Sequence, residues 1–108
     1  MKRGEIYWYT FKAPDKRRPI LVLTRNTIIP YLNTVTIAPI TTRIRDIPSE
    51  VLLTTEDGMY ETCVINFDNI QTVSQTKIGK IITRLSPERL DDIRKAISFA
   101  LELDNNLW

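Results

Sequence analysis

The chain has 108 residues, of which 43% are hydrophobic and 26% are charged, a composition typical of one globular domain. This balance excludes a disordered or fibrous protein, and no window approaches the about 18 consecutive apolar residues that a membrane-spanning helix needs. The basic start Met1-Lys2-Arg3 is not followed by the apolar core of a signal peptide. We therefore expect a cytoplasmic protein without a membrane partner.

The net charge of +2 hides a division of charge along the chain. Residues 1–45 carry nine cations and two anions, a net +7, whereas residues 46–108 carry six cations and eleven anions, a net −5. A basic half suits a polyanionic partner, of which nucleic acid is the commonest.

The first predicted strand, residues 5–11, shows the clearest period of two. Aromatic and β-branched residues alternate along it, so that one face carries Ile6 and Trp8 and the other carries Tyr7, Tyr9 and Phe11.

Further short apolar stretches follow, separated by turn residues. A connection over residues 26–33 is expected to hold a short helical turn, and Pro39 is expected to end the third strand. The predicted strands cover residues 5–11, 20–25, 34–39, 50–54, 62–66, 70–73 and 81–83. Strands this short and this close together are typical of a barrel or a strongly bent sheet.

A helix is predicted at the end of the chain. Ser86-Pro87-Glu88 supplies an N-cap residue, a proline at the first helical position and an anion in the first turn. We expect this helix to run to about Leu103, to contain an Asp91–Lys95 ion pair and to pack on the open face of the sheet. Its apolar stripe comprises Leu90, Ile93, Ile97, Ala100 and Leu101. Residues 1–108 should form a single, mainly β domain with a C-terminal helix.

The run Lys16-Arg17-Arg18-Pro19 leads into the second predicted strand. Cations held on a rigid edge suit an anionic ligand, although a solvated charged turn is the alternative.

Several other chemistries lack the residues that they need. There is no histidine, and Cys63 is the only cysteine and is expected to be a buried thiol, so we expect neither a metal nor a cofactor. Glu56, Asp57 and Glu61 surround a turn and are expected to be solvated. Arginines and hydroxyls remain, and such groups bind phosphate. An enzyme can cut RNA with them by positioning the RNA's own 2′-OH and neutralising the phosphate.

An ordered set of blocks resembles the MazF/PemK family of toxin endoribonucleases from toxin–antitoxin systems. The blocks are Arg3–Tyr7, Arg18–Leu23, Ala38–Thr42, Cys63–Thr72 and the helix entry Ile82–Glu88. The resemblance implies an SH3-like β-barrel with a C-terminal helix that works as a homodimer. It also implies metal-independent cleavage of single-stranded mRNA, with the 2′-OH as nucleophile, and a cognate antitoxin whose acidic segment covers the basic cleft.

The resemblance also assigns roles to residues. Arg18 matches the catalytic arginine and Thr41 the catalytic threonine, although the Thr41 hydroxyl would by default close its own turn. Expected RNA contacts, to phosphates or to a base, come from Lys16, Arg17, Thr42, Arg43 and Asn69. For Asn69, closure of a turn is the alternative.

One departure from the family concerns the loop between the first two strands. Only Lys12 to Arg17 fills this space, and the glutamate that many members carry before the arginine is absent. The nearest carboxylate is Asp15, which is a weak base beside two cations. We therefore expect a more open cleft and a cleavage motif that differs from that of long-loop members.

Two other functions stay open. A CcdB-like toxin would use the same barrel to poison gyrase, and a non-catalytic barrel would bind RNA without cutting it. The pairing of Arg18 with Thr41 favours the ribonuclease. Burial of Tyr7, Trp8 and Phe11 by self-association would suit a homodimer, but we expect these aromatics to be ordinary core, so the homodimer rests on the resemblance.

Overall fold

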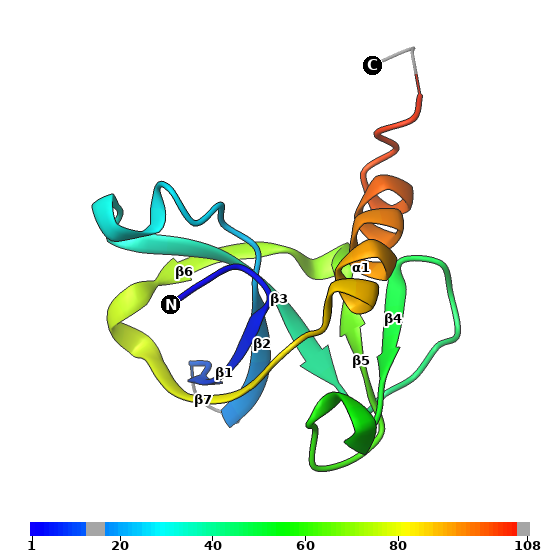
Figure 1. Ribbon diagram of the computed structural model, residues 1–108, viewed down its shortest axis with the longest axis horizontal. Helices are drawn as coiled ribbons and strands as arrows, with labels where there is room; N and C mark the ends of the chain where they lie inside the picture. Colours follow the sequence, from blue (N-terminus) through cyan, green and yellow to red (C-terminus); the bar gives the residue numbers. More distant parts are fainter. Residues whose placement is uncertain (13–16, 106–108) are drawn as a thin grey trace.

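The computed structural model describes residues 1–12 and 17–105, and Figure 1 shows an antiparallel sheet with a helix packed beside it. Lys16 and Asp15 thus lie outside the described residues. The strands are β1 (Glu5–Thr10), β2 (Arg17–Val22), β3 (Thr34–Thr41), β4 (Glu50–Leu53), β5 (Cys63–Asn66), β6 (Gln71–Ser74) and β7 (Ile78–Arg84), followed by helix α1 (Pro87–Ala100). This confirms the mainly β fold with a C-terminal helix.

The strands are ordered β4-β5-β3-β2-β1-β7, and β6 also pairs with β3. Because no ladder joins β4 to β7 in the described part of the chain, the sheet curls like a barrel without closing. In the described part of the chain four 3-10 turns connect the strands, namely Ile29–Tyr31, Thr55–Asp57, Phe67–Asn69 and Gln75–Lys77. The first of them confirms the helical turn expected between the second and third strands.

Strand β3 is the long strand around which the sheet bends. Its first part pairs with β6 up to Ile37, and its last two residues, Ile40 and Thr41, pair with β5. The prediction that Pro39 ends this strand was therefore wrong. A proline fits here because β3 changes partner between Ile37 and Ile40, so this side of the strand has no ladder bond to lose at Pro39.

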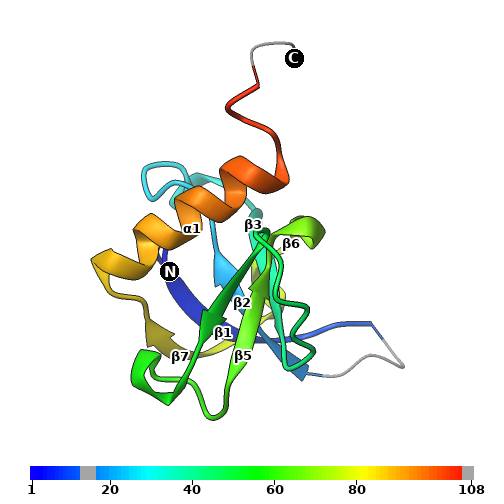
Figure 2. The same ribbon diagram turned by 90° about the vertical axis from the view of Figure 1, so that its right-hand side faces the viewer.

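Two apolar clusters lie on the two faces of the curled sheet. The larger contains Ile6, Phe67 and Ile93 and is covered by α1, which contacts β4 and the turn Phe67–Asn69 (Figures 1 and 2). The smaller contains Tyr9, with Tyr7 and Phe11 packed against it. The predicted alternation in the first strand is thus confirmed, and Tyr7 and Phe11 are partly buried against the smaller cluster.

The second strand begins earlier than predicted. It starts at Arg17 and ends at Val22, and Arg17 and Arg18 pair with Thr10 and Tyr9 of β1. The two arginines are therefore held within the sheet and do not precede it. Their register was not visible locally, because it is fixed by the partner strand.

The helix is shorter than predicted. It ends at Ala100, and Glu102 adopts a left-handed backbone with φ of 52°, which stops the helical repeat before Leu103. Ser86 is the N-cap residue, but its side chain makes no capping hydrogen bond to the backbone. The predicted Asp91–Lys95 pair is present at 3.4 Å.

Candidate active site

A cleft of about 460 Å³ lies where β1, β2 and the end of β3 meet the connection between β4 and β5. Arg17, Arg18, Thr41 and Thr42, four of the predicted site residues, line this cleft. The fold thus brings together side chains that are more than twenty residues apart in the sequence.

The two arginines enter the cleft from β2. Both side chains are exposed, and the guanidinium carbon of Arg17 lies 4.3 Å from the centre of the Trp8 ring on β1. A guanidinium over an indole face makes a cation–π contact, which restricts the conformations of a long side chain. Arg18 is the neighbouring cation, and its pairing with the core residue Tyr9 fixes its backbone.

Thr41 is the last residue of β3, and its backbone is paired with Val64 of β5. Its hydroxyl oxygen accepts a hydrogen bond of 3.1 Å from the backbone N–H of Arg43, so it does close its own turn. A hydroxyl that accepts one hydrogen bond still has its O–H proton to donate. Closing the turn therefore orients the hydroxyl at the cleft and leaves it able to donate to a phosphate oxygen.

Two predicted RNA contacts do not line the cleft. Arg43 is exposed just beyond it, and Asn69 is exposed at the end of the turn Phe67–Asn69. The backbone carbonyl of Asn69 accepts a hydrogen bond of 3.4 Å from the side chain of Gln71.

Tyr60 and Glu61 are among the cleft residues that were not predicted as site residues, and Glu61 was expected only as a solvated carboxylate. Both lie on the connection between β4 and β5, and Glu61 is the only acidic residue among the described residues that line the cleft. Tyr60 is 75% exposed and its ring stacks on Trp8, with centroids 6.0 Å apart and planes 22° from parallel. The available signal was an aromatic residue and an acidic residue that follow the turn at Gly58. A turn in the sequence does not show which part of the folded protein its residues face.

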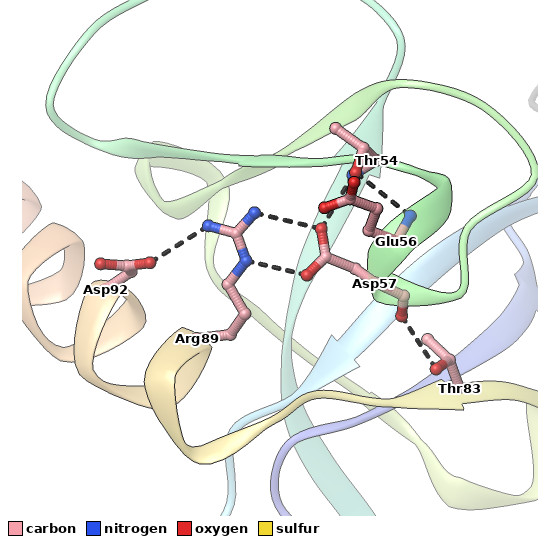
Figure 3. Close-up of polar contacts among 6 residues, drawn as sticks. All are labelled: Thr54, Glu56, Asp57, Thr83, Arg89 and Asp92. Carbon is pink, nitrogen blue, oxygen red and sulfur yellow. Dashed lines mark hydrogen bonds and ion pairs between the residues drawn. The ribbon is translucent and has the colours of Figure 1, made fainter.

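This connection is tied to the rest of the protein through Asp57 (Figure 3). The carboxylate of Asp57 accepts hydrogen bonds from Arg89 Nε at 2.8 Å, from Arg89 Nη2 at 3.1 Å and from the backbone N–H of Thr54 at 2.9 Å. The Arg89 hydrogen bonds hold the pKa of Asp57 below its ordinary value, and they outweigh burial, which acts in the opposite direction. The expectation that Asp57 is simply solvated was therefore wrong.

Two more contacts fix the same turn against β7. The Thr83 hydroxyl donates a hydrogen bond of 3.0 Å to the carbonyl oxygen of Asp57. Gly58 follows with φ of +95°, and a Cβ at this position would overlap the Thr83 side chain. The segment that carries Tyr60 and Glu61 is thus anchored to both α1 and β7.

Cys63 also lines the cleft, and it is 3% exposed. Burial raises the pKa of its thiol to about 11, and the nearby carboxylates of Glu61 and Asp57 add to this rise. The prediction of a buried thiol is confirmed, and a thiol with this pKa does not supply a thiolate nucleophile at neutral pH.

Among residues 1–12 and 17–105, no group of three or more His, Cys, Asp and Glu side chains is placed to hold a metal ion. No helix in the same part of the chain is long and apolar enough to cross a membrane.

Residues 2–101 match a family described as PemK-like, MazF-like toxins of type II toxin–antitoxin systems. Endoribonuclease MazF3 of Mycobacterium tuberculosis (strain ATCC 25618 / H37Rv) is 38% identical over 90 residues, which cover 83% of this chain and 87% of the relative. The probable endoribonuclease MazF5 of the same strain is 40% identical over 103 residues, or 94% of this chain and 89% of the relative.

Solved structures give the same result. The Mycobacterium tuberculosis toxin MazF-mt6 matches with a TM-score of 0.84 and 34% identity, covering 91% of this chain and 96% of that chain. A mycobacterial endoribonuclease solved in complex with its cognate antitoxin matches with a TM-score of 0.84 and 25% identity, covering 95% and 96%. The chain belongs to the PemK-like, MazF-like family of toxins from type II toxin–antitoxin systems.

Proposed function

We propose that this protein is the toxin of a toxin–antitoxin system and an endoribonuclease that cleaves single-stranded mRNA at a short sequence. The observation that carries the proposal is the cleft that both Arg18 and Thr41 line. The relatives named as endoribonucleases support this chemistry over gyrase poisoning and over RNA binding without cleavage.

In the proposed reaction the RNA supplies its own nucleophile. The 2′-oxygen attacks the adjacent phosphorus, the bond to the 5′-oxygen breaks, and the products are a 2′,3′-cyclic phosphate and a 5′-hydroxyl. Arg18 donates hydrogen bonds to the phosphate oxygens, where negative charge develops, and Thr41 donates one more. This assignment needs no metal, because the guanidinium supplies the positive charge.

The reaction also requires an acceptor for the proton of the 2′-OH. Glu61 lines the same cleft, and a carboxylate is a suitable general base when it lies within reach of the hydroxyl. We assign this role to Glu61 in place of Asp15. The leaving 5′-oxygen takes its proton from water, because an arginine is a poor acid.

The remaining assignments concern affinity and partners. Arg17, Thr42, Arg43 and Lys16 would contact phosphates, and Asn69, which lies away from the cleft, would contact a more distant nucleotide. A cognate antitoxin with an acidic segment would compete for the same cations. A homodimer and a cytoplasmic location are what the family leads us to expect for a toxin that acts on mRNA.

The test is to incubate the purified protein with EDTA and a long single-stranded RNA, beside the variants Arg18→Ala and Arg25→Ala. Arg25 is an exposed arginine outside the cleft and serves as the matched control. Wild type and Arg25→Ala should produce fragments that end in 2′,3′-cyclic phosphate, whereas Arg18→Ala should leave the RNA intact.

Each contrary result has a definite meaning. Intact RNA with the wild-type protein, both in EDTA and after addition of a divalent ion, would reject the ribonuclease and would favour the gyrase-directed or non-catalytic function. Cleavage that needs a divalent ion would reject the metal-free mechanism. Cleavage by Arg18→Ala at the wild-type rate would show that the catalytic residue is wrongly assigned.

A further inference from the structure

We propose that the exposed ring of Tyr60 is a stacking platform for one unpaired base of the bound RNA. This inference rests on the proposed function in one respect, that the ligand of the cleft is a single-stranded nucleic acid. It goes further in assigning a nucleobase subsite, built from Tyr60 and Trp8, to the cleft that the arginines of β2 also line.

Exposure alone would not support the proposal, because single exposed aromatics are common on protein surfaces. Tyr31 illustrates this, since it is 81% exposed on the turn Ile29–Tyr31 and does not line the cleft. Tyr60 differs in its surroundings. It is 75% exposed inside a cleft that also holds Arg17 and Arg18.

The ring of Tyr60 is held in place before any ligand arrives. It stacks on Trp8, and Trp8 in turn carries the guanidinium of Arg17. The preceding residue, Met59, is 6% exposed and belongs to the core cluster under α1. A ring that is already ordered loses little conformational freedom on binding, so stacking of a base on it is correspondingly more favourable.

The backbone on the N-terminal side of Tyr60 is fixed as well. Asp57 is bound to Arg89 of α1 and to Thr83 of β7 (Figure 3), and the left-handed Gly58 directs the chain from this anchor toward the cleft. The platform therefore has a defined position relative to β2. A base stacked there would have a fixed distance from the phosphate that Arg18 contacts.

The chemistry of the cleft favours a nucleotide over an apolar peptide. Single-stranded nucleic acids are held by a cationic groove that follows the backbone together with aromatic rings on which bases stack. Arg17 and Arg18 supply the cations, and Tyr60 supplies an aromatic face next to them. Because every base has a π face, Tyr60 should contribute affinity for any base and should influence where the RNA is cut by fixing the register of the strand.

The test uses short single-stranded oligomers of 2′-O-methyl ribonucleotides, which lack the nucleophile and cannot be cleaved. One oligomer of each base and one abasic oligomer of equal length are titrated against the full chain by fluorescence anisotropy. The proteins are the wild type, Tyr60→Ala, Tyr60→Phe and the control Tyr31→Ala. These probes need no knowledge of the cleavage motif and give a result even if the protein cuts no RNA.

We expect Tyr60→Ala to weaken binding of base-bearing oligomers by about 5- to 150-fold and to leave the affinity for the abasic oligomer unchanged. Tyr60→Phe and Tyr31→Ala should bind like the wild type. An equal loss for base-bearing and abasic oligomers, or no loss for either, would overturn the proposal. The same proteins are also titrated with an acidic peptide that mimics an antitoxin segment. If Tyr60→Ala weakens binding of this peptide only, the proposal is overturned, since Tyr60 would then serve protein recognition.

Discussion

Replacement of Arg89 by methionine should destabilise the protein through Asp57. The guanidinium donates two hydrogen bonds to this carboxylate, whose side chain is 11% exposed, and methionine keeps the apolar stem but removes the charge. A hydrogen bond to a charged group contributes about 1.5–3 kcal/mol, and losing one partner of a buried pair leaves the other charge desolvated.

The magnitude is reduced by two features of the structure. Asp57 keeps the hydrogen bond from the backbone N–H of Thr54, and water can reach the site because the side chain of Arg89 is itself 30% exposed. We therefore expect a total loss of about 2–3 kcal/mol, near the lower end for a buried pair. For a domain of this size, that loss lowers Tm by about 10 °C.

The assay is thermal unfolding followed by circular dichroism, with Arg94→Met as the matched control. Arg94 lies on the same helix and contacts Asp91 at 2.8 Å, but the two side chains are 72% and 53% exposed. An exposed pair of this kind contributes about 0.5 kcal/mol or less, so Tm should fall by no more than about 2 °C. Equal losses of Tm in the two variants would refute the reasoning.

The same pair predicts a dependence on pH. The pKa of Asp57 is lowered in the folded protein from its ordinary value of 3.8, so the stabilisation is fully present above that value. This stabilisation is lost as the pH falls through the folded pKa, because the protonated carboxyl is neutral and no longer forms an ion pair with the guanidinium. The difference in Tm between wild type and Arg89→Met should therefore be constant near neutral pH and narrow below about pH 4. A gap that stays constant down to about pH 2 would contradict this assignment.

Two further predictions concern the cleft. Glu61→Gln should slow RNA cleavage about 100-fold or more while RNA binding is kept or strengthened. The control Glu56→Gln changes an exposed carboxylate outside the cleft and should match the wild type. Timed cleavage measures the rate, and anisotropy titration measures the binding. Cys63 should react with a thiol reagent at pH 8 at least about 100-fold more slowly in the folded protein than in urea, since its pKa is raised to about 11 from 9.0 and its side chain is buried; the release of a coloured thiolate measures both rates.

The elements that could be predicted are those whose signal is local. Alternation along the first strand separates Ile6 from Tyr7 and Tyr9, and the structure puts them in different clusters for that reason. The apolar stripe that includes Ile93 likewise predicted the helix, because the buried face of a helix follows from the periodicity of its own residues.

Features that depend on how strands pair could not be predicted. The start of β2 at Arg17 is set by its register with Thr10, seven residues before it, and the passage of β3 through Pro39 is possible because the strand changes partner there. Neither pairing can be read from the residues of one strand alone. The predicted end of the third strand was wrong because a rule for isolated strands was applied to a strand shared by two parts of the sheet.

The candidate site divides in the same way. Arg18 and Thr41 were found because each lies in a block that resembles a known family, but Tyr60 and Glu61 lie outside those blocks. They reach the cleft only because the turn at Asp57 is tied to α1 and β7. Finding them from the sequence would require knowing which turn of the chain faces β2.

The position of Glu61 bears on how the cleft acts on RNA. A carboxylate next to bound phosphates repels them, so this side chain weakens binding of the substrate in its ground state. Such a cost is compatible with rapid cleavage when the same group interacts more favourably in the transition state, where it holds the proton of the attacking 2′-OH. The neighbouring arginines also attract a carboxylate that takes no part in the reaction, so the test is whether binding and catalysis respond differently to its loss. Glu61→Gln should therefore move binding and catalysis in opposite directions, and a variant in which both fall together would show that Glu61 only shapes the cleft.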